Sequence, residues 1–278
     1  MDLRRLAITG SLLALAACSK PAPPQPERDV STNARVIFRS ADGRELKLGD
    51  LEGATGKVKW EVIGAGAVPP EAIALHEQGR AAGAKDDYAK AIELLEAAHK
   101  KAPDWPYPVY DLAFTYQLKG DDVRAEEEYA IVNKLAPRGF FTDKTSIDCL
   151  RRQRGGAFPP GFCKAFAMLE WMDDAAQKRK ALEGIVEKFP AFAPAWKDLA
   201  VLLDDQGAKL HAIEQGLTHE PDEETKGVLL INKAIILDAR GDHDGAVRIL
   251  GELALDPRST LGVEAMAKAT LAHLTRKR

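Results

Sequence analysis

The sequence of 278 residues lacks the short patterns that mark most enzymes and metal sites. Its three cysteines form no Cys-x-x-Cys pair, and none of its six histidines stands in a His-Glu-x-x-His motif, so the common zinc patterns are absent. The phosphate-binding, dinucleotide-binding and nucleophile-elbow glycine motifs are absent as well. We therefore expect no metal, no cofactor and no enzymatic activity. The enzymatic alternative would need a site built from residues 138–160.

A strong charge of one sign is also missing. Lysine and arginine number 39 and aspartate and glutamate 42, which gives a net charge of −3 with both signs interspersed. Proteins that bind nucleic acid usually carry a strongly basic domain or stripe, so we expect no nucleic-acid partner. With 45% hydrophobic and 29% charged residues, the composition is that of a soluble globular or repeat protein with ample core.

The longest apolar run near the N-terminus is too short to span a membrane. Residues 6–17 follow Arg4 and Arg5 and fall far short of the ~20 residues that a spanning helix needs, so residues 1–17 are expected to be a signal peptide. The run ends in Leu-Ala-Ala-Cys18, which resembles the lipobox of bacterial lipoproteins. The resemblance implies that Cys18 becomes the first mature residue and carries diacylglyceryl and acyl chains. The alternative is a plain secretory peptide in which Cys18 falls at the cleavage site by chance.

The residues after Cys18 bear on location. Two or more acyl chains anchor a protein stably to a bilayer. In bacterial lipoproteins an aspartate after the lipidated cysteine tends to retain the protein in the inner membrane, and Ser19 stands there instead. The resemblance therefore implies an outer-membrane location facing the periplasm. Residues 18–35 are polar and rich in proline, which predicts an extended, lipidated tether without a core of its own.

A pattern with a period of thirty-four residues dominates the segment 70–137. Small, bulky and proline positions repeat together: Gly79 with Ala113, Ala91 with Ala125, Leu95 with Tyr129, Ala98 with Val132, and Pro103 with Pro137. This resembles the tetratricopeptide repeat (TPR), in which small residues let two helices of a hairpin approach closely. One such hairpin cannot cover its own apolar face, so we expect further, more degenerate copies to stack on these two clear ones.

The segments on either side of the two clear repeats differ from them. Residues 36–66 contain alternating apolar residues and an Asp42-Gly43 turn, which predict a hairpin or three-stranded sheet that docks on the first repeat through Trp60. An exposed edge of this sheet that accepts a partner strand is the alternative. Beyond the clear repeats, residues 161–278 show weaker hairpin patterns, including a pair over 162–172 and 175–188, and a final amphipathic helix from about 261 to 274. The predicted fold class is an all-α, TPR-like α-solenoid of about five helical hairpins with a capping helix and a small N-terminal sheet.

Residues 138–160 interrupt the repeats and are expected to form a disulfide-bonded insert. With Cys18 lipidated, Cys149 and Cys163 remain in an oxidising compartment, and a bond between them would pin the insert. Two buried free thiols are the alternative. The insert also carries the basic run 151–154, which is expected to be a solvated loop face, with contact to an anionic partner as the alternative.

The resemblance to the TPR family also implies where a partner would bind. In that family the first helix of each repeat lines a groove, and the groove positions here are Tyr107, Tyr110, Phe114 and Gln117 in the second copy with His76 and Arg80 in the first. TPR domains that clamp a C-terminal carboxylate use a Lys and Asn pattern on these helices, so that activity is not expected. An exposed aromatic stripe can grip an extended segment. The alternative is that the sheet or the tether covers this stripe as core.

The most economical function is a lipid-anchored scaffold for protein–protein interactions that supports assembly of an envelope complex. Its partner would be an envelope protein or peptide segment whose identity the sequence does not give. A module that binds glycan or peptidoglycan fragments on the same aromatic residues is the alternative.

Overall fold

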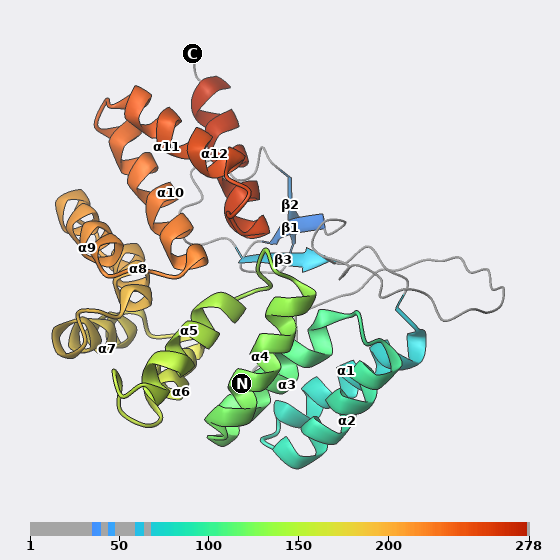
Figure 1. Cartoon of the computed structure of the whole chain (residues 1–278). Coiled ribbons are helices and arrows are strands. Elements are labelled where there is room, and N and C mark those ends of the chain that lie inside the picture. The colour runs from blue at the N-terminus through green and yellow to red at the C-terminus, as the bar shows by residue number, and fades with distance from the viewer. Residues whose placement is uncertain (1–34, 40–43, 48–58, 64–67, 277–278) are drawn as a thin grey trace. The chain divides into compact units, whose positions relative to one another are not determined.

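The computed structural model describes residues 35–39, 44–47, 59–63 and 68–276 (Figure 1). The fold is all-α and TPR-like, with a small sheet near the N-terminus. By contacts it divides into two compact units, which we call the first unit, comprising Ile63–Asp143, and the second unit, comprising Val36–Val62 and Lys144–Arg278. The predicted signal peptide (1–17) and most of the tether (18–35) lie outside the described residues. No helix in the described part of the chain is both long and apolar enough to cross a membrane.

The first unit consists of two helical hairpins at the predicted period. Its helices are α1 (Pro70–Gly83), α2 (Tyr88–Lys101), α3 (Pro106–Lys119) and α4 (Asp122–Leu135), and each packs on the next. A Cβ atom at Gly79 would lie 2.8 Å from Cγ of Leu95, so only glycine allows this close approach of α1 and α2. The two clear repeats are therefore confirmed as helix pairs.

The helix starts of the first unit repeat with the same period. Asp87 accepts a hydrogen bond from the backbone N–H of Lys90, and Asp121, thirty-four residues later, accepts one from Arg124. An aspartate at this position satisfies a backbone donor that the helix itself leaves unpaired. Gly120 ends α3 in the left-handed conformation, with φ of 88°, which is typical of a glycine after a helix.

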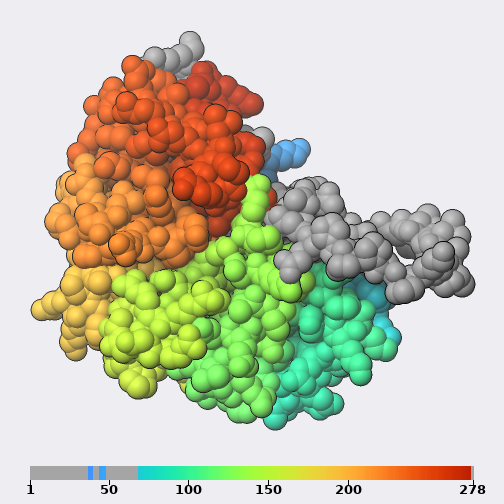
Figure 2. Space-filling view, in the orientation of Figure 1, coloured from blue at the N-terminus to red at the C-terminus, as the bar shows by residue number. Residues whose placement is uncertain are grey.

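The second unit contains the remaining helices. They are α5 (Asp143–Arg154, with Asp143 at the boundary of the two units), α6 (Phe162–Met168), the short 3₁₀ helix η3 (Leu169–Trp171), α7 (Ala175–Lys188), α8 (Ala193–Leu202), α9 (Gln206–Thr218), α10 (Glu223–Ala239), α11 (His243–Leu255) and α12 (Leu261–Arg276). The pairs α8/α9 and α10/α11 are hairpins, and α12 packs on both α10 and α11 in the place of the predicted capping helix. On the face that Figure 2 shows, the side chains of successive helices within each unit meet without gaps.

Two predictions about residues 138–188 are wrong. The expected disulfide loop is largely the helix α5, which begins where Asp143 accepts a hydrogen bond from the Phe140 N–H at 2.7 Å. The expected hairpin of residues 162–172 with 175–188 is not formed, because α7 packs on α8 and α6 is bonded to α5 through a disulfide. Phe162 and Phe166 of α6 instead contact the segment that follows α7, with ring centroids 5.0 and 4.7 Å from Phe192.

The predicted three-stranded sheet is present. Strands β1 (Arg35–Arg39), β2 (Glu45–Leu46) and β3 (Lys59–Ile63) form it in the order β2-β1-β3, and β1 pairs antiparallel with β2 through Phe38 opposite Leu46. Ile37 and Phe38 are buried. Residues Val36–Val62, which include most of the three strands, group with the second unit. The expected docking on the first repeat stays a prediction. The turn at 42–43 and the side chain of Trp60 lie outside the described residues.

Candidate functional site

The predicted aromatic stripe of the first unit is largely covered by the chain itself. Tyr107 is only 5% exposed, and its ring centroid lies 4.7 Å from that of Phe140 and 5.6 Å from that of Phe141. Tyr110 is half-buried beside the same two rings, and its hydroxyl is hydrogen-bonded to Thr142 at 2.8 Å. The prediction that Tyr107 faces an open groove is therefore wrong. The rings that cover it, Phe140 and Phe141, belong to the segment that follows α4.

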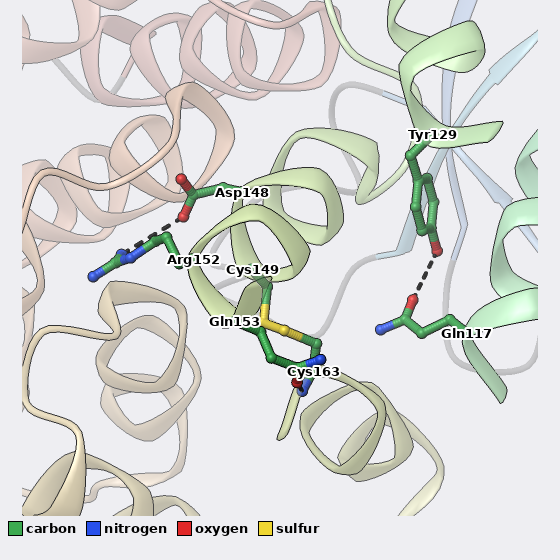
Figure 3. Close-up of a disulfide and its surroundings, with 7 residues drawn as sticks. All are labelled: Gln117, Tyr129, Asp148, Cys149, Arg152, Gln153 and Cys163. Atoms are coloured by element: carbon green, nitrogen blue, oxygen red, sulfur yellow. Dashed lines mark hydrogen bonds and ion pairs between the residues drawn. A yellow bond between two sulfur atoms is a disulfide. The ribbon is translucent and has the colours of Figure 1, made fainter. Parts of the chain in front are cut away.

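Gln117 is also part of the core of the first unit. Its Oε1 atom accepts a hydrogen bond from the Tyr129 hydroxyl at 3.1 Å, and the residue is 2% exposed (Figure 3). The repeat pattern placed Tyr129 inside the hairpin, and a buried hydroxyl requires a hydrogen-bond partner. Gln117 satisfies that requirement, so its assignment to the groove is wrong.

His76 and Arg80 of α1 share one carboxylate of α3. His76 Nε2 lies 2.7 Å from Asp111 Oδ2, and Arg80 Nε lies 3.5 Å from the same oxygen. The His76 ring is 1% exposed and packs edge-on against Trp105 at 4.9 Å, so His76 cannot face a groove and that prediction is wrong. The cluster joins the first helices of the two repeats.

Three of the predicted groove residues remain partly exposed. Arg80, Tyr110 and Phe114 are half-buried, and each has contacts within the protein. They are the only members of the predicted set that a partner could touch without rearrangement of the core. Their role in binding stays a prediction.

A charged cluster in the second unit was not anticipated from the sequence. It brings together side chains from α5, α8 and the start of α10. Thr145 of α5 donates a hydrogen bond to Asp222 at 3.1 Å, and Asp222 in turn accepts from the backbone N–H groups of Glu224 and Thr225. From α8, Lys197 Nζ lies 3.3 Å from Asp198 Oδ1.

The electrostatics of this cluster show how its charges depend on one another. Burial lowers the pKa of Lys197, but the carboxylates of Asp198, Glu224 and Asp222 outweigh it, so that the pKa is raised overall. The ammonium group is thus held in its charged form by three acids. Glu224 is buried, with 6% of its surface exposed. The Asp198 side chain on α8 is 31% exposed and can therefore contact solvent or a partner.

Asp148 and Arg152 add a second ion pair from α5. Their charged groups are 3.6 Å apart, and Figure 3 shows them on a different side of the helix from Cys149 and Gln153. Burial raises the pKa of Asp148, Asp222 raises it further, and Arg152 opposes both. Arg152 is fixed by a hydrogen bond from Nη2 to the Ala191 carbonyl at 2.8 Å. The basic run lies in helix α5 rather than in a loop, and its Arg151 and Arg154 are exposed as expected of a solvated face.

The predicted disulfide between Cys149 and Cys163 is present. It joins α5 to α6 with a Cα–Cα distance of 5.9 Å, and both cysteines are buried (Figure 3). Gln153, one turn after Cys149, accepts a hydrogen bond from the Cys163 backbone N–H at 3.0 Å. The bond and the glutamine together fix α5 to α6, on a side of α5 other than the one that carries Asp148 and Arg152.

Sequence patterns could not have found the charged cluster. The Thr145 and Asp222 side chains are hydrogen-bonded across a separation of 77 residues, and Lys197 lies on a third helix. The only local sequence feature that pointed to the cluster is the adjacent pair Lys197-Asp198 on the first helix of a hairpin. Among the described residues no group of three or more His, Cys, Asp or Glu side chains is placed to hold a metal ion. What the cluster offers chemically is ion pairing and hydrogen bonding on a partly open helix face.

Comparison with known proteins adds fold-level likenesses. No protein-family model matches the chain, and no curated protein is similar to it in sequence. Among solved structures, MamA (residues 41 to the end) from Desulfovibrio magneticus RS-1 aligns with 16% identity over 67% of this chain and 94% of its own, with a TM-score of 0.33. TTC0263, a thermophilic TPR protein of Thermus thermophilus, aligns with 18% identity over 72% of this chain and 99% of its own, with a TM-score of 0.31.

A third similar structure is larger than this chain. The APC/C hetero-tetramer Cut9-Hcn1 aligns with 13% identity over 73% of this chain and 42% of its own, with a TM-score of 0.30. The TPR-like character of the fold is carried by the helix pairs, their close-approach glycine and their recurring caps.

Proposed function

We propose that the protein is a scaffold for protein–protein interactions that is anchored by lipid in the cell envelope and holds a segment of a partner protein. The observation that carries the proposal is the convergence of charged side chains from α5, α8 and α10 on one partly open face of the second unit. In a TPR-like fold the first helices of successive pairs lie beside one another, as α8 and α10 do here, and so offer an extended surface.

The exposure of this face supports a binding role over a purely structural one. The side chains of Asp148, Arg152, Asp198 and Lys197 are 34%, 25%, 31% and 18% exposed, so none of them is sealed. Partly desolvated charges with shifted pKa values are commoner at functional sites than elsewhere. A polypeptide with polar and charged side chains is the ligand that such a face fits.

The glycan-binding alternative receives less support. It needs aromatic rings whose faces are free to stack on sugars, and Tyr107 is buried beneath Phe140 and Phe141. Tyr110 has the same two rings beside it. We therefore favour a protein partner.

A charge-neutralising pair of substitutions tests the proposed face. Asp148→Asn with Asp198→Asn removes two of the partly exposed acids of the cluster. We expect partner recovery by in-cell crosslinking to fall at least about tenfold, since two charged contacts at ~0.7–1.5 kcal/mol each are lost. The matched control is Asp173→Asn with Asp204→Asn, which makes the same charge change at exposed residues outside the cluster. Equal recovery with both variants would refute this face as the binding site.

The anchor is tested separately. Cys18→Ser is expected to abolish incorporation of labelled palmitate and to release the protein from the membrane fraction, because acyl chains on Cys18 supply the anchor. The outer-membrane location predicts that the wild-type protein sediments with outer-membrane vesicles in a density gradient. Palmitate labelling that persists in Cys18→Ser would contradict the lipidation site without affecting the binding face.

A further inference from the structure

One side of α4 in the first unit exposes apolar side chains at helical spacing. Val123 is 62% exposed and Ile131 is 38% exposed. They are eight residues apart with Glu127 midway, so that all three lie on neighbouring positions of one helix face, over ~12 Å at the usual rise per residue. Single exposed apolar residues are normal, whereas two on one short stripe form a small patch. The other large exposed apolar side chains among the described residues, Met168 and Leu255, lie on other helices.

Carboxylates border this stripe. Glu127 and Glu128 lie on α4 between Val123 and Ile131, and the charge of Glu96 on α2 acts on Glu128, so three acids lie in or near the patch. The nearby cation is Arg124, which donates to the Tyr116 hydroxyl at 3.0 Å, lies over the Tyr116 ring and pairs with Asp121 at 3.8 Å. Arg124 is thus shared among several groups. Lys134 marks the C-terminal end of the same face.

The pKa of Glu128 shows that Arg124 does not fully offset the negative charge of the neighbouring carboxylates. Burial and, after it, the charges of Glu96 and Glu127 together raise the pKa of Glu128 to about 6, and Arg124 only partly opposes them. From α3, the Tyr116 hydroxyl donates to Glu96 Oε1 at 3.4 Å rather than to Glu128. At neutral pH the three carboxylates therefore repel one another across a partly desolvated surface, and an added cation would relieve that repulsion.

We propose that this face, formed by Val123, Glu127, Glu128 and Ile131 of α4 with Glu96 of α2, docks an amphipathic helix of a partner protein whose apolar stripe is flanked by Lys or Arg. Two apolar residues two turns apart match the side chains that a partner helix presents at the same spacing. The carboxylates match flanking cations and disfavour an acidic partner. The patch is small, so the interface belongs to the weak and transient class.

This surface belongs to the first unit, whereas the charged face belongs to the second. The proposal goes beyond the proposed function, because α4 is the second helix of its hairpin. The proposed function instead uses a surface that includes the first helices α8 and α10. Failure of the docking proposal would leave the binding role of α5, α8 and α10 untouched.

A designed peptide gives the direct test. The probe is a helical peptide with a leucine stripe flanked by lysines, measured by fluorescence anisotropy against the whole protein without its first 34 residues. We expect a Kd in the micromolar range that weakens several-fold as salt rises from 50 to 300 mM, since exposed charges are screened. The matched peptides are the same helix with glutamates for lysines and a scramble of the lysine peptide without the stripe. Equal binding of either control would overturn the proposal, as would no binding of the lysine peptide.

Substitutions locate the site on the protein. Val123→Ser with Ile131→Ser is expected to weaken binding at least tenfold while leaving the melting temperature nearly unchanged, because both side chains are already exposed. The matched control is Met168→Ser, which removes an exposed apolar side chain elsewhere and should not alter binding. Unaltered binding in the double variant would overturn the proposal.

The pH dependence provides a readout that simple apolar adhesion would not give. Because Glu128 must be ionised to meet a cation, affinity is expected to rise by about tenfold at most between pH 5 and pH 7.5, with the change centred near pH 6. Glu128→Gln should bind more weakly at pH 7.5 and lose most of this pH dependence. A wild-type profile that is flat over this range, or one that Glu128→Gln leaves unchanged, would contradict the role given to the carboxylates.

Discussion

Both units contain TPR-like helix pairs, but the surfaces formed by the first helices of these pairs differ in exposure. One is covered by the chain itself, and the other stays partly exposed. In the first unit aromatic side chains occupy the face, and the chain's own Phe140 and Phe141 cover Tyr107. In the second unit charged side chains occupy it, and Asp148 and Asp198 stay partly exposed. Burial of aromatic rings is favourable because it removes apolar surface from water. Burial of charged groups is unfavourable unless the free-energy cost of their desolvation is offset. The chemistry of a few positions therefore decides whether such a face closes on itself or remains open for a partner.

The comparison predicts that the aromatic cover is the more important of the two for stability. Phe140→Ala should lower the free energy of unfolding by about 3–5 kcal/mol, because the ring is 1% exposed and its loss leaves a cavity beside Tyr107 and Tyr110. Chemical denaturation is the measurement. The control Val123→Ala, at an exposed position, should change stability by less than about 0.5 kcal/mol. A loss for Phe140→Ala as small as that of the control would break the comparison.

The disulfide should matter to the second unit alone. Replacing Cys149 and Cys163 by alanine removes a bond that spans 14 residues, for which chain entropy predicts a loss of about 3 kcal/mol. Hydrogen exchange followed by mass spectrometry should show faster exchange in α5 and α6 and unchanged exchange in α1 and α2. Equal acceleration in α1 and α2 would show that the two units do not respond separately.

The charged cluster should tolerate change less well at its centre than at its edge. Lys197→Met leaves the Asp198, Asp222 and Glu224 carboxylates without their shared cation, and we expect a loss of about 2 kcal/mol, below the value for a fully sealed pair. Denaturation of the variant at pH 7 measures it. Adding Glu224→Gln to Lys197→Met should recover part of the loss, and a further loss instead would contradict repulsion as the cause.

The loss of stability caused by Lys197→Met is expected to depend on pH. The pKa of Lys197 is raised in the folded state, so its stabilising effect is fully present below the unfolded value of about 10.4 and is lost as pH rises through the folded value. The gap in stability between wild type and Lys197→Met should therefore be constant from pH 7 to 9 and narrow above pH 10.5. A gap that widens with rising pH would contradict this sign.

The smallest expected effect is a gain in stability from a substitution at Glu128. Glu128→Gln should stabilise the first unit by less than about 1 kcal/mol at pH 7.5, because the carboxyl is ionised there against its neighbours and its partial exposure screens the repulsion. Since the folded pKa is raised to about 6, the wild-type protein gains stability as pH falls from 6 toward the ordinary value. The advantage of the variant should thus fade below about pH 5 in thermal melts. An advantage that grows on acidification would count against the assignment.

Local pattern was enough for the parts of the fold that rest on short-range rules. The period of the repeat predicted α1 to α4 and the close approach at Gly79, and the two cysteines left after Cys18 predicted the disulfide. Helix α5 was missed because its polar, basic sequence between glycines resembles a loop. Its stability comes from Ile147 and Leu150 in the core, from the hydrogen bond of Asp143 to the Phe140 N–H just before the helix, and from the disulfide bond to α6.

The state of the two faces depended on contacts that no window of sequence contains. The cover of Tyr107 comes from residues more than thirty positions later, and the family pattern places that tyrosine in an open groove whatever residues come after α4. The charged cluster draws on three helices, with Thr145 and Asp222 77 residues apart. Repeat patterns therefore predicted the scaffold but not which of its faces is available.

Phe141 carries a consequence of its own. Its φ angle of 52° places an aromatic residue in the left-handed region, where a side chain is disfavoured by about 1–2 kcal/mol. The backbone tolerates this conformation because the ring rests on Tyr107 and Tyr110. Glycine at position 141 would relax the main chain and remove one of the two rings that cover Tyr107, leaving Phe140 in place. The residue is therefore a position at which a closed repeat surface could be partly opened without redesigning a helix.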